Sequence, residues 1–363
     1  MLLQAAKRIL SCMGGDKYLR EPKRHLVWLP LGHAFELNAG LLSNVMGTGG
    51  TYVFFDPDVS SLGQSADLPL PHLLMSALAY HQPIHSMTAV PAIMASIIDN
   101  MTPDQLDLLR ALHSLTVGGA TGSTALFHWA REKGLRYYDM VGMTEAAGPI
   151  CARSARSTID GMSIFNVGLM GVLVKDDERD EYGELVLIGK NLPRTYESRS
   201  GKAFSYDEMT GVSIYRTGDL YTPGPSFVGE ILMANDSLPE FNERAPPLSD
   251  IHFFGRVDDI LALSSGIKIN AADAEHLLNS QPEISQSAII LNKAGDALVA
   301  MVQPDPSASQ AAITDVILRL NRALPFEKKI QRHNITFVES LPMTSKATLH
   351  RKKLKYILHQ AGG

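Results

Sequence analysis

Apolar positions in the first third of the chain follow an alternating pattern. From about residue 25 to about residue 120, short apolar runs typical of buried strands alternate with amphipathic stretches of helical spacing. The predicted strands are 25–31, 51–55, 85–90 and 114–117, and the predicted helices are 34–46, 71–80, 91–98 and 103–112. Strands separated by helices pair in parallel, so this region predicts a doubly wound α/β sheet with ligands beyond the carboxyl ends of its strands.

The pattern changes near residue 168. As far as residue 233, short strands are divided by Gly, Pro and Asp, which is typical of a small β subdomain. Helices and strands then alternate again after residue 270, which predicts a compact α+β domain. The predicted elements of these two regions are strands 183–188, 213–216, 229–233, 286–291, 297–302 and 335–338, with helices 272–278 and 311–324.

These patterns predict two domains, because 363 residues are too many for one ordinary core. We expect a large domain at residues 1–254, which is α/β to about residue 165 and β-rich from about residue 166. A C-terminal domain should follow at residues 255–363.

Composition and charge narrow the class of protein. With 45% hydrophobic and 20% charged residues the chain is globular, and its net charge of -5 and pI near 6.2 argue against general nucleic-acid binding. Two cysteines provide no disulfide framework, so a reducing, cytoplasmic location is expected. The apolar residues after Met1 recur at helical spacing, but Lys7 and Arg8 interrupt them. We therefore predict neither a signal peptide nor a membrane span.

A charged stretch lies between two apolar segments at residues 253–270. Gly255 breaks the first segment, and Arg256, Asp258 and Asp259 follow before the second. Unpaired charge is costly to bury, so these residues suit either a solvated hairpin loop or a junction between domains. At a junction, Asp258 would tolerate the changing dihedral angles that a hinge needs.

Three strand ends carry candidate chemistry. Thr144 and Glu145 close a strand, where they suit either a phosphate and Mg²⁺ site or the start of a helix. Gly118 and Gly119 would let a flat ligand approach the backbone, or form an ordinary turn. Asp219 could accept from the two hydroxyls of a ribose, or form a local turn with its own backbone.

Four segments, in this order, resemble the motifs of the adenylate-forming superfamily of acyl-CoA synthetases, luciferases and peptide-synthetase adenylation domains. They are 141–145 (VGMTE), 215–220 (YRTGDL), 253–270 (FFGRVDDILALSSGIKIN) and 341–348 (LPMTSKAT). The resemblance runs from about residue 26 to about residue 354. It implies a large α/β domain with a small β subdomain, followed by a C-terminal domain that rotates.

The resemblance also implies a reaction and its partners. A carboxylic acid, here an acyl or aryl acid, would react with ATP and Mg²⁺ to form an acyl-adenylate. Coenzyme A or the phosphopantetheine of a carrier protein would then take the acyl group as a thioester. Matching the motifs residue by residue places the adenosine of ATP against Gly118, Gly119, Ala120, Val141, Asp219 and Arg256.

The remaining matched residues would act on the reacting groups. Thr144 would bind phosphate, Glu145 would bind Mg²⁺, and His33 would lie at the acyl pocket, together with residues 35, 38, 117–120 and 140–143. Lys346, which by spacing alone resembles one more lysine of a solvated basic face, would neutralise charge on the α-phosphate. Asp258 would be the hinge.

The sequence departs from the family pattern in several places. Members carry a Ser/Thr/Gly-rich phosphate loop that ends in Pro-Lys, and nothing before Leu26 resembles it. In addition, Val141 replaces an aromatic residue, Ala347 replaces a glycine, and Ile267 replaces a polar residue. We therefore expect a truncated large domain with impaired ATP binding. Two alternatives stay open, which are a non-catalytic binding protein of this fold and the back part of an enzyme whose N-terminal fragment is made separately.

Overall fold

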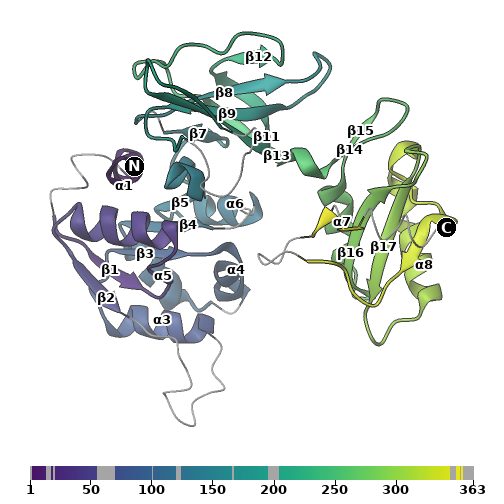
Figure 1. Ribbon diagram of the computed structural model, residues 1–363. Coiled ribbons are helices and arrows are strands. Elements are labelled where there is room, and N and C mark those ends of the chain that lie inside the picture. Colours follow the sequence, from purple (N-terminus) through teal and green to yellow (C-terminus); the bar gives the residue numbers. More distant parts are fainter. Residues whose placement is uncertain are drawn as a thin grey trace. The chain divides into compact units, whose positions relative to one another are not determined.

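The computed structural model describes residues 2–13, 18, 21–54, 70–99, 101–119, 124–165, 167–194, 204–343, 349–351 and 353–354. Contacts between residues divide the chain into two units (Figure 1). Unit 1 consists of Met1–Thr217 and Tyr221–His252, and unit 2 consists of Gly218–Leu220 and Phe253–Gly363. No described helix combines the length and the apolar composition that a membrane crossing requires.

Unit 1 is built on a parallel sheet in which neighbouring strands follow the order β2, β1, β3, β4, β5. These strands are β1 (Arg24–Val27), β2 (Thr51–Phe54), β3 (Ser86–Ala89), β4 (Ser114–Gly118) and β5 (Tyr137–Met143). The predicted doubly wound α/β fold is therefore confirmed. The first strand is shorter than the pattern predicted, because Pro30 opens a turn in which its carbonyl accepts from the amide of His33.

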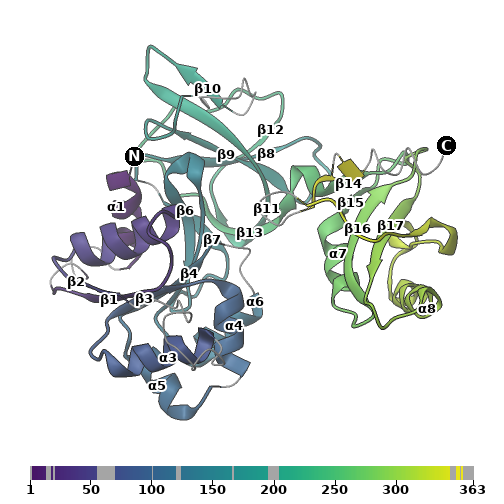
Figure 2. The ribbon, with the colours of Figure 1, turned by 60° about the horizontal axis from the view of Figure 1, so that its bottom comes forward.

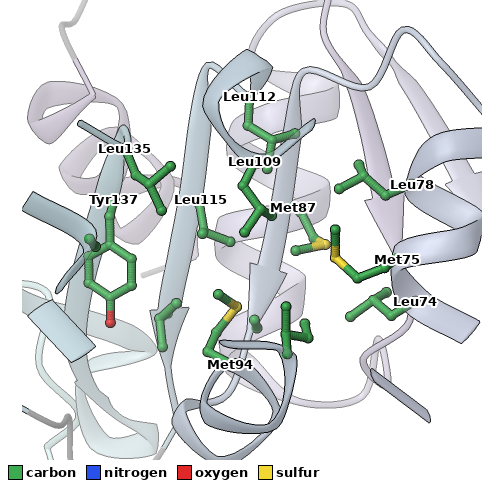
Figure 3. Packing of buried hydrophobic residues seen from close by; sticks show 14 of the residues in the cluster. Leu74, Met75, Leu78, Met87, Met94, Leu109, Leu112, Leu115, Leu135 and Tyr137 are labelled. Atoms are coloured by element: carbon green, nitrogen blue, oxygen red, sulfur yellow. The ribbon is translucent and has the colours of Figure 1, made fainter. Parts of the chain in front are cut away.

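Helices cover both faces of this sheet (Figures 1 and 2). Buried leucine and methionine side chains fill one side, and Tyr137 of β5 closes this core (Figure 3). An apolar cluster around Ile9, Ala39 and Met140 fills the other side. The helices of the first side are α3 (Leu70–Tyr80), α4 (Pro91–Asp99), α5 (Pro103–Ala111) and α6 (Thr124–Glu132), and those of the second are α1 (Leu2–Cys12) and η1 (Glu36–Met46).

The helix η1 differs from the prediction in its geometry, because it is a π-helix along its whole length. The side chains of Ser43 and Asn44 donate to the carbonyls of Asn38 and Ala39, each five residues earlier. Short polar side chains that bond to the backbone compete with the ordinary helical pattern. This spacing matches the backbone pattern of the π-helix.

The β-rich part of unit 1 begins earlier than residue 166, since β6 already pairs antiparallel with β5. The strand predicted at 213–216 also continues as far as Val228, through glycines and prolines that normally end a strand. The strands of this part are β6 (Gly148–Ser154), β7 (Met162–Ile164), β8 (Met170–Lys175), β9 (Gly183–Gly189), β10 (Phe204–Asp207), β11 (Val212–Val228), β12 (Ile231–Met233) and β13 (Ser249–Arg256).

One buried carboxylate ties this β-rich part together. Asp250 adopts a left-handed backbone conformation with φ of 55° and is 3% exposed. Its carboxylate accepts from the amides of Gly161, at 3.2 Å, and Ser226, at 2.6 Å. Both donors lie far away in the sequence, so the side chain fixes the path of three segments.

We expect Asp250→Ala to lower the free energy of unfolding of unit 1 by about 2 kcal/mol, because two amides lose an ionised acceptor. Asp250→Asn keeps one acceptor and tolerates the left-handed backbone, so its loss should be smaller. Trp28 and Trp129 both lie in unit 1, so tryptophan fluorescence during denaturant unfolding reports on this unit. An alanine variant as stable as the wild type would contradict the role given to Asp250.

Unit 2 has an α+β core, as the pattern predicted. The hairpin β14–β15 and the helices α7 and α8 pack on the three-stranded sheet β16–β17–β18 through a shared apolar cluster. The elements are η4 (Val257–Asp259), β14 (Ile260–Ala262), β15 (Lys268–Asn270), α7 (Ala271–Asn279), β16 (Ile284–Leu291), β17 (Leu298–Pro304), α8 (Gln310–Leu320), η5 (Asn321–Ala323), η6 (Phe326–Lys328), η7 (Arg332–Asn334) and β18 (Ile335–Phe337).

Candidate functional site

Two glycines end strand β4, and the structure separates their roles. Gly118 is buried, and a Cβ atom at this position would lie 2.6 Å from the Met140 carbonyl oxygen and 3.1 Å from the Phe35 ring. Gly119 is exposed and has a φ of 83°, and among the described residues the nearest atom to a Cβ there would belong to Val90, at 3.8 Å. Packing inside the protein therefore explains Gly118, whereas Gly119 leaves open backbone at the strand end. Ala120 lies outside the described residues.

Strand β5 ends in a tight turn that carries the candidate phosphate and Mg²⁺ residues. Thr144 and Glu145 lie in the short 3₁₀ helix η3 (Thr144–Ala146), where Thr144 is exposed and Glu145 half-buried. Ala147 follows in the left-handed region with φ of 59°, and its amide donates to the Thr144 carbonyl at 3.0 Å. A non-glycine residue held in this region costs free energy, so neighbouring contacts must hold the turn in place.

Two buried side chains hold this turn from outside it. Arg8 of α1 donates to the carbonyl of Ala146 at 3.2 Å, and Asn38 of η1 donates to the carbonyl of Ala147 at 2.7 Å. Both side chains belong to residues that are 0% exposed. The motifs gave no indication of Arg8, and they placed Asn38 only as a pocket residue.

The segment of His33 lies beside these strand ends. Phe35 packs with Met140 in the cluster between η1 and β5, and its ring borders Gly118. His33 is exposed, and its carbonyl accepts from the amide of Leu37 as the helix begins. Since Asn38 reaches the turn after Glu145, the structure brings together three of the predicted regions, which are 33–38, 117–119 and 140–147. Val141 is half-buried and packs on the core of the β-rich part.

The candidate ribose residues form an ion pair in unit 2. The guanidinium of Arg256 donates to the carboxylate of Asp219, whose side chain is 11% exposed while that of Arg256 is 50% exposed. Gly218 has a φ of 71°, and a Cβ atom there would lie 3.0 Å from the Arg256 guanidinium. The Thr-Gly-Asp sequence therefore lets the guanidinium approach the carboxylate. Thr144 and Glu145 belong to unit 1.

The predicted hinge residue differs from its neighbour in its contacts. Asp258 is exposed and makes no hydrogen bond or ion pair with the described residues. Asp259 accepts from Arg351 at 2.5 Å and so belongs to a buried ion network of unit 2. An exposed, uncommitted side chain suits a residue whose dihedral angles change. Lys346 and Ala347 lie outside the described residues, between Met343 and Leu349, which form an isolated β-bridge.

The carboxylates of the candidate site suit Mg²⁺ only in a limited role. In the described ranges no group of three or more His, Cys, Asp or Glu residues could hold a metal by itself. Mg²⁺ that arrives with a nucleotide needs only one or two carboxylates, because phosphates and water supply its other ligands. Glu145, half-buried beside an exposed hydroxyl, fits that limited role.

Two family models match the chain. The model described as AMP-binding enzyme matches residues 3–197, and the model described as AMP-binding enzyme C-terminal domain matches residues 258–359. The first match covers more than half of the 363 residues. It begins in α1, so the similarity reaches further towards the N-terminus than the motifs indicated.

Individual relatives are more distant. Hispidin synthase of Neonothopanus nambi is 27% identical over 295 residues, which cover 75% of this chain and 16% of that protein. The mitochondrial acyl-coenzyme A synthetase ACSM4 of Rattus norvegicus is 24% identical over 292 residues, covering 75% of this chain and 45% of that protein. The chain therefore spans less than half the length of these two relatives.

A solved structure shares the fold. The o-succinylbenzoate CoA synthetase (MenE) of Bacillus subtilis, in complex with its acyl-adenylate intermediate, aligns with a TM-score of 0.66 and 21% identity, covering 98% of this chain and 65% of that chain. The same enzyme in complex with ATP and magnesium ion aligns with a TM-score of 0.64 and 20% identity, covering 98% and 66%.

Proposed function

Because the chain belongs to the family of AMP-binding enzymes, we propose that it activates a carboxylic acid with ATP and passes the acyl group to a thiol. The observation that carries this proposal is the family match over residues 3–197, which contains the open strand end at Gly119 and the turn at Thr144–Glu145. The ion pair of Asp219 with Arg256 supports it, because a carboxylate whose position is fixed by a guanidinium suits a ribose.

The proposed reaction has two steps. A carboxylate oxygen attacks the α-phosphorus of ATP, and the bond to pyrophosphate breaks, which gives the acyl-adenylate. The sulfur of a thiol, either coenzyme A or phosphopantetheine, then attacks the acyl carbon, AMP leaves, and the thiol proton passes to solvent. The apolar and small residue types that we assign to the acyl pocket, at 35, 117–120 and 140–143, favour an acyl or aryl acid over an amino acid, whose ammonium would require a carboxylate partner.

In the first step the protein must hold phosphates and offset negative charge. We assign the Thr144 hydroxyl to donate to a phosphate oxygen and the Glu145 carboxylate to hold Mg²⁺. When bound, Mg²⁺ neutralises charge on the phosphates. We assign Lys346 to supply a movable ammonium for the charge that builds on the α-phosphate, after unit 2 has turned about Asp258.

The phosphate loop sets the expected rate. Residues 1–25 contain no Ser/Thr/Gly-rich segment ending in Pro-Lys, so a polypeptide of these 363 residues should hold the β- and γ-phosphates weakly. Each missing charge-assisted hydrogen bond costs about 1.5–3 kcal/mol. The same observation favours a second candidate function, which is a protein that binds nucleotide without adenylating an acid.

Exchange of labelled pyrophosphate into ATP separates these functions. The purified polypeptide is assayed over fatty, aryl and amino acids, alone and with a separate polypeptide that supplies a phosphate loop. We expect weak exchange that depends on an acyl or aryl acid and that the added polypeptide raises. Nucleotide binding without exchange in either mixture would overturn the proposed activity and support the binding protein.

The proposed role of Lys346 gives a further expectation. Lys346→Ala should abolish the acid-dependent exchange, because an ammonium that meets the transition state is lost. It should leave the transfer from preformed acyl-AMP to a thiol largely unchanged. Lys353→Ala, a neighbouring lysine in the same basic segment, is the matched control and should retain both steps.

Exchange that survives in Lys346→Ala would assign the charge-neutralising role to another cation. Equal loss of both steps would instead point to a structural effect on unit 2.

A further inference from the structure

The turn that carries Thr144 and Glu145 connects β5 to β6 and contains one strained residue. Ala147 lies in the left-handed region, where a side chain clashes with its own backbone. Inside the turn the Ala147 amide donates to the Thr144 carbonyl, and the flanking strands β5 and β6 pair antiparallel with Met143 opposite Gly148. The carbonyls of Ala146 and Ala147 point out of the turn and need donors from elsewhere.

Those donors come from two helices that pack on the same side of the sheet. Arg8 reaches the Ala146 carbonyl and, at 3.0 Å, the carbonyl of Val167. Asn38 reaches the Ala147 carbonyl and, at 2.7 Å, the carbonyl of Ala34. Arg8 therefore links the turn to the backbone at residue 167, and Asn38 links it to the start of its own helix.

The environment makes these contacts stronger than surface hydrogen bonds. Arg8 and Asn38 are 0% exposed, and Ala146 is 1% exposed. Burial lowers the pKa of Arg8 to about 10, which still leaves the guanidinium charged at neutral pH. A charged donor held next to a carbonyl in a dry environment cannot be replaced by water.

We propose that Arg8 and Asn38 are positioning residues that hold Thr144 and Glu145 in place for the phosphates of a nucleotide. This inference rests on the proposed function, since it names the residues on which the geometry of that site depends. Neither residue reaches the reacting atoms in this assignment. They act through the carbonyls of Ala146 and Ala147, directly after Glu145.

We call the hydrogen bonds of Arg8 and Asn38 to the carbonyls of Ala146 and Ala147 the clamp. Hydrogen exchange tests this clamp without any assumption about activity. In Arg8→Met and in Asn38→Leu, the amides of residues 143–148 should exchange about tenfold faster than in the wild type, because one unsatisfied buried carbonyl corresponds to about one power of ten in an equilibrium constant. Arg131→Met is the matched control. Arg131 donates to the carbonyls of Ala155 and Ser157, far from this turn.

Binding of Mg-ATP, measured by calorimetry on the same variants, separates positioning from a structural role. We expect affinity to fall about tenfold in Arg8→Met and Asn38→Leu, and to stay unchanged in Arg131→Met. Arg8→Lys keeps one donor and should fall between the wild type and Arg8→Met in both measurements. It also replaces Arg8→Met if that variant does not fold.

Each outcome decides a separate point. Unchanged hydrogen exchange at residues 143–148 in the Arg8 variants would show that Arg8 does not hold the turn. Faster exchange with unchanged affinity for Mg-ATP would show that the clamp is structural and would overturn the positioning role. If the unaltered polypeptide binds no nucleotide, the proposed function and the positioning role fail together, and the exchange measurement still decides whether the clamp on the turn exists.

Discussion

Arg351→Met is expected to lower the free energy of unfolding of unit 2 by about 3 kcal/mol or more, because it leaves two carboxylates without their cation. The Arg351 side chain is 13% exposed and donates to both oxygens of Glu275, at 2.8 and 2.9 Å, and to Asp259. Burial raises the pKa of the Glu275 carboxyl, and the neighbouring Arg351 opposes that shift. Without the guanidinium, the cost of burying Glu275 is no longer offset.

Hydrogen exchange in unit 2 measures this loss. The Ile289 amide donates to Glu275 at 2.8 Å, so it and the amides of α7 should lose protection together. Tryptophan fluorescence should not change, since both tryptophans lie in unit 1. Arg332→Met is the control, because Arg332 and its partner Asp315 are 70% and 77% exposed, and such pairs contribute about 0–1 kcal/mol.

A loss in Arg351→Met as small as that in Arg332→Met would contradict the role of the buried network. The network also has a consequence for the proposed reaction. Arg351 joins the residue after the proposed hinge, Asp259, to the segment that follows residues 344–348. A weaker network should therefore reduce the precision with which unit 2 presents Lys346.

The helices and strands of this fold could be predicted, because each depends on a local sequence pattern. The helix predicted at 103–112 lies at Pro103–Ala111, and Thr102 and Gln105 form the capping box at its start. The helix predicted at 71–80 lies at Leu70–Tyr80. Spacing of apolar residues decides which face of each element is buried, so sequence alone placed these elements in the correct order.

The side-chain contacts around the candidate site and in unit 2 could not be predicted from the sequence, because each joins residues far apart in the chain. Arg8 and Ala146 are 138 positions apart, and Arg351 and Asp259 are 92 apart. The one local signal of Arg8 is its place among the buried positions Ala5, Ala6 and Ile9 of α1, where a charge needs partners. In the sequence alone, Arg8 only interrupts an apolar run.

The motifs, by contrast, indicated one pair of residues that are close in space. They assign Arg256 and Asp219 to one ribose, and the structure shows an ion pair between these two side chains. The roles of Glu145, Asp258 and Lys346 stay predictions, since each depends on a bound nucleotide or on a movement of unit 2. Sequence reasoning therefore proposes the chemical groups, whereas the structure shows which buried side chains contact the backbone beside them.

The second large effect is expected in unit 1, where Arg153→Met should leave the buried carboxylate of Asp139, in strand β5, without its partner. Asp139 is 1% exposed and accepts from Arg153 at 2.8 and 3.0 Å, while the guanidinium lies 4.1 Å from the centre of the Phe127 ring. Removing one partner of a buried pair costs about 3–5 kcal/mol at neutral pH. Tryptophan fluorescence in denaturant measures this loss.

The pH dependence of that loss identifies its cause. Burial raises the pKa of Asp139 above its ordinary value of 3.8, and Arg153 opposes that shift. In Arg153→Met the pKa in the folded state must rise further, so the folded variant binds a proton that the unfolded chain releases. Stability linked to such a group is complete below 3.8 and is lost as pH rises through the folded pKa. The deficit of the variant should therefore shrink as pH falls from about 7.5 towards 5, by at most about 1.4 kcal/mol per pH unit.

The double variant Asp139→Asn, Arg153→Met lacks the titrating group, so its deficit should not change over this range. A single-variant deficit that is equally constant would assign the loss to the packing of Arg153 on Phe127 instead of to the carboxylate.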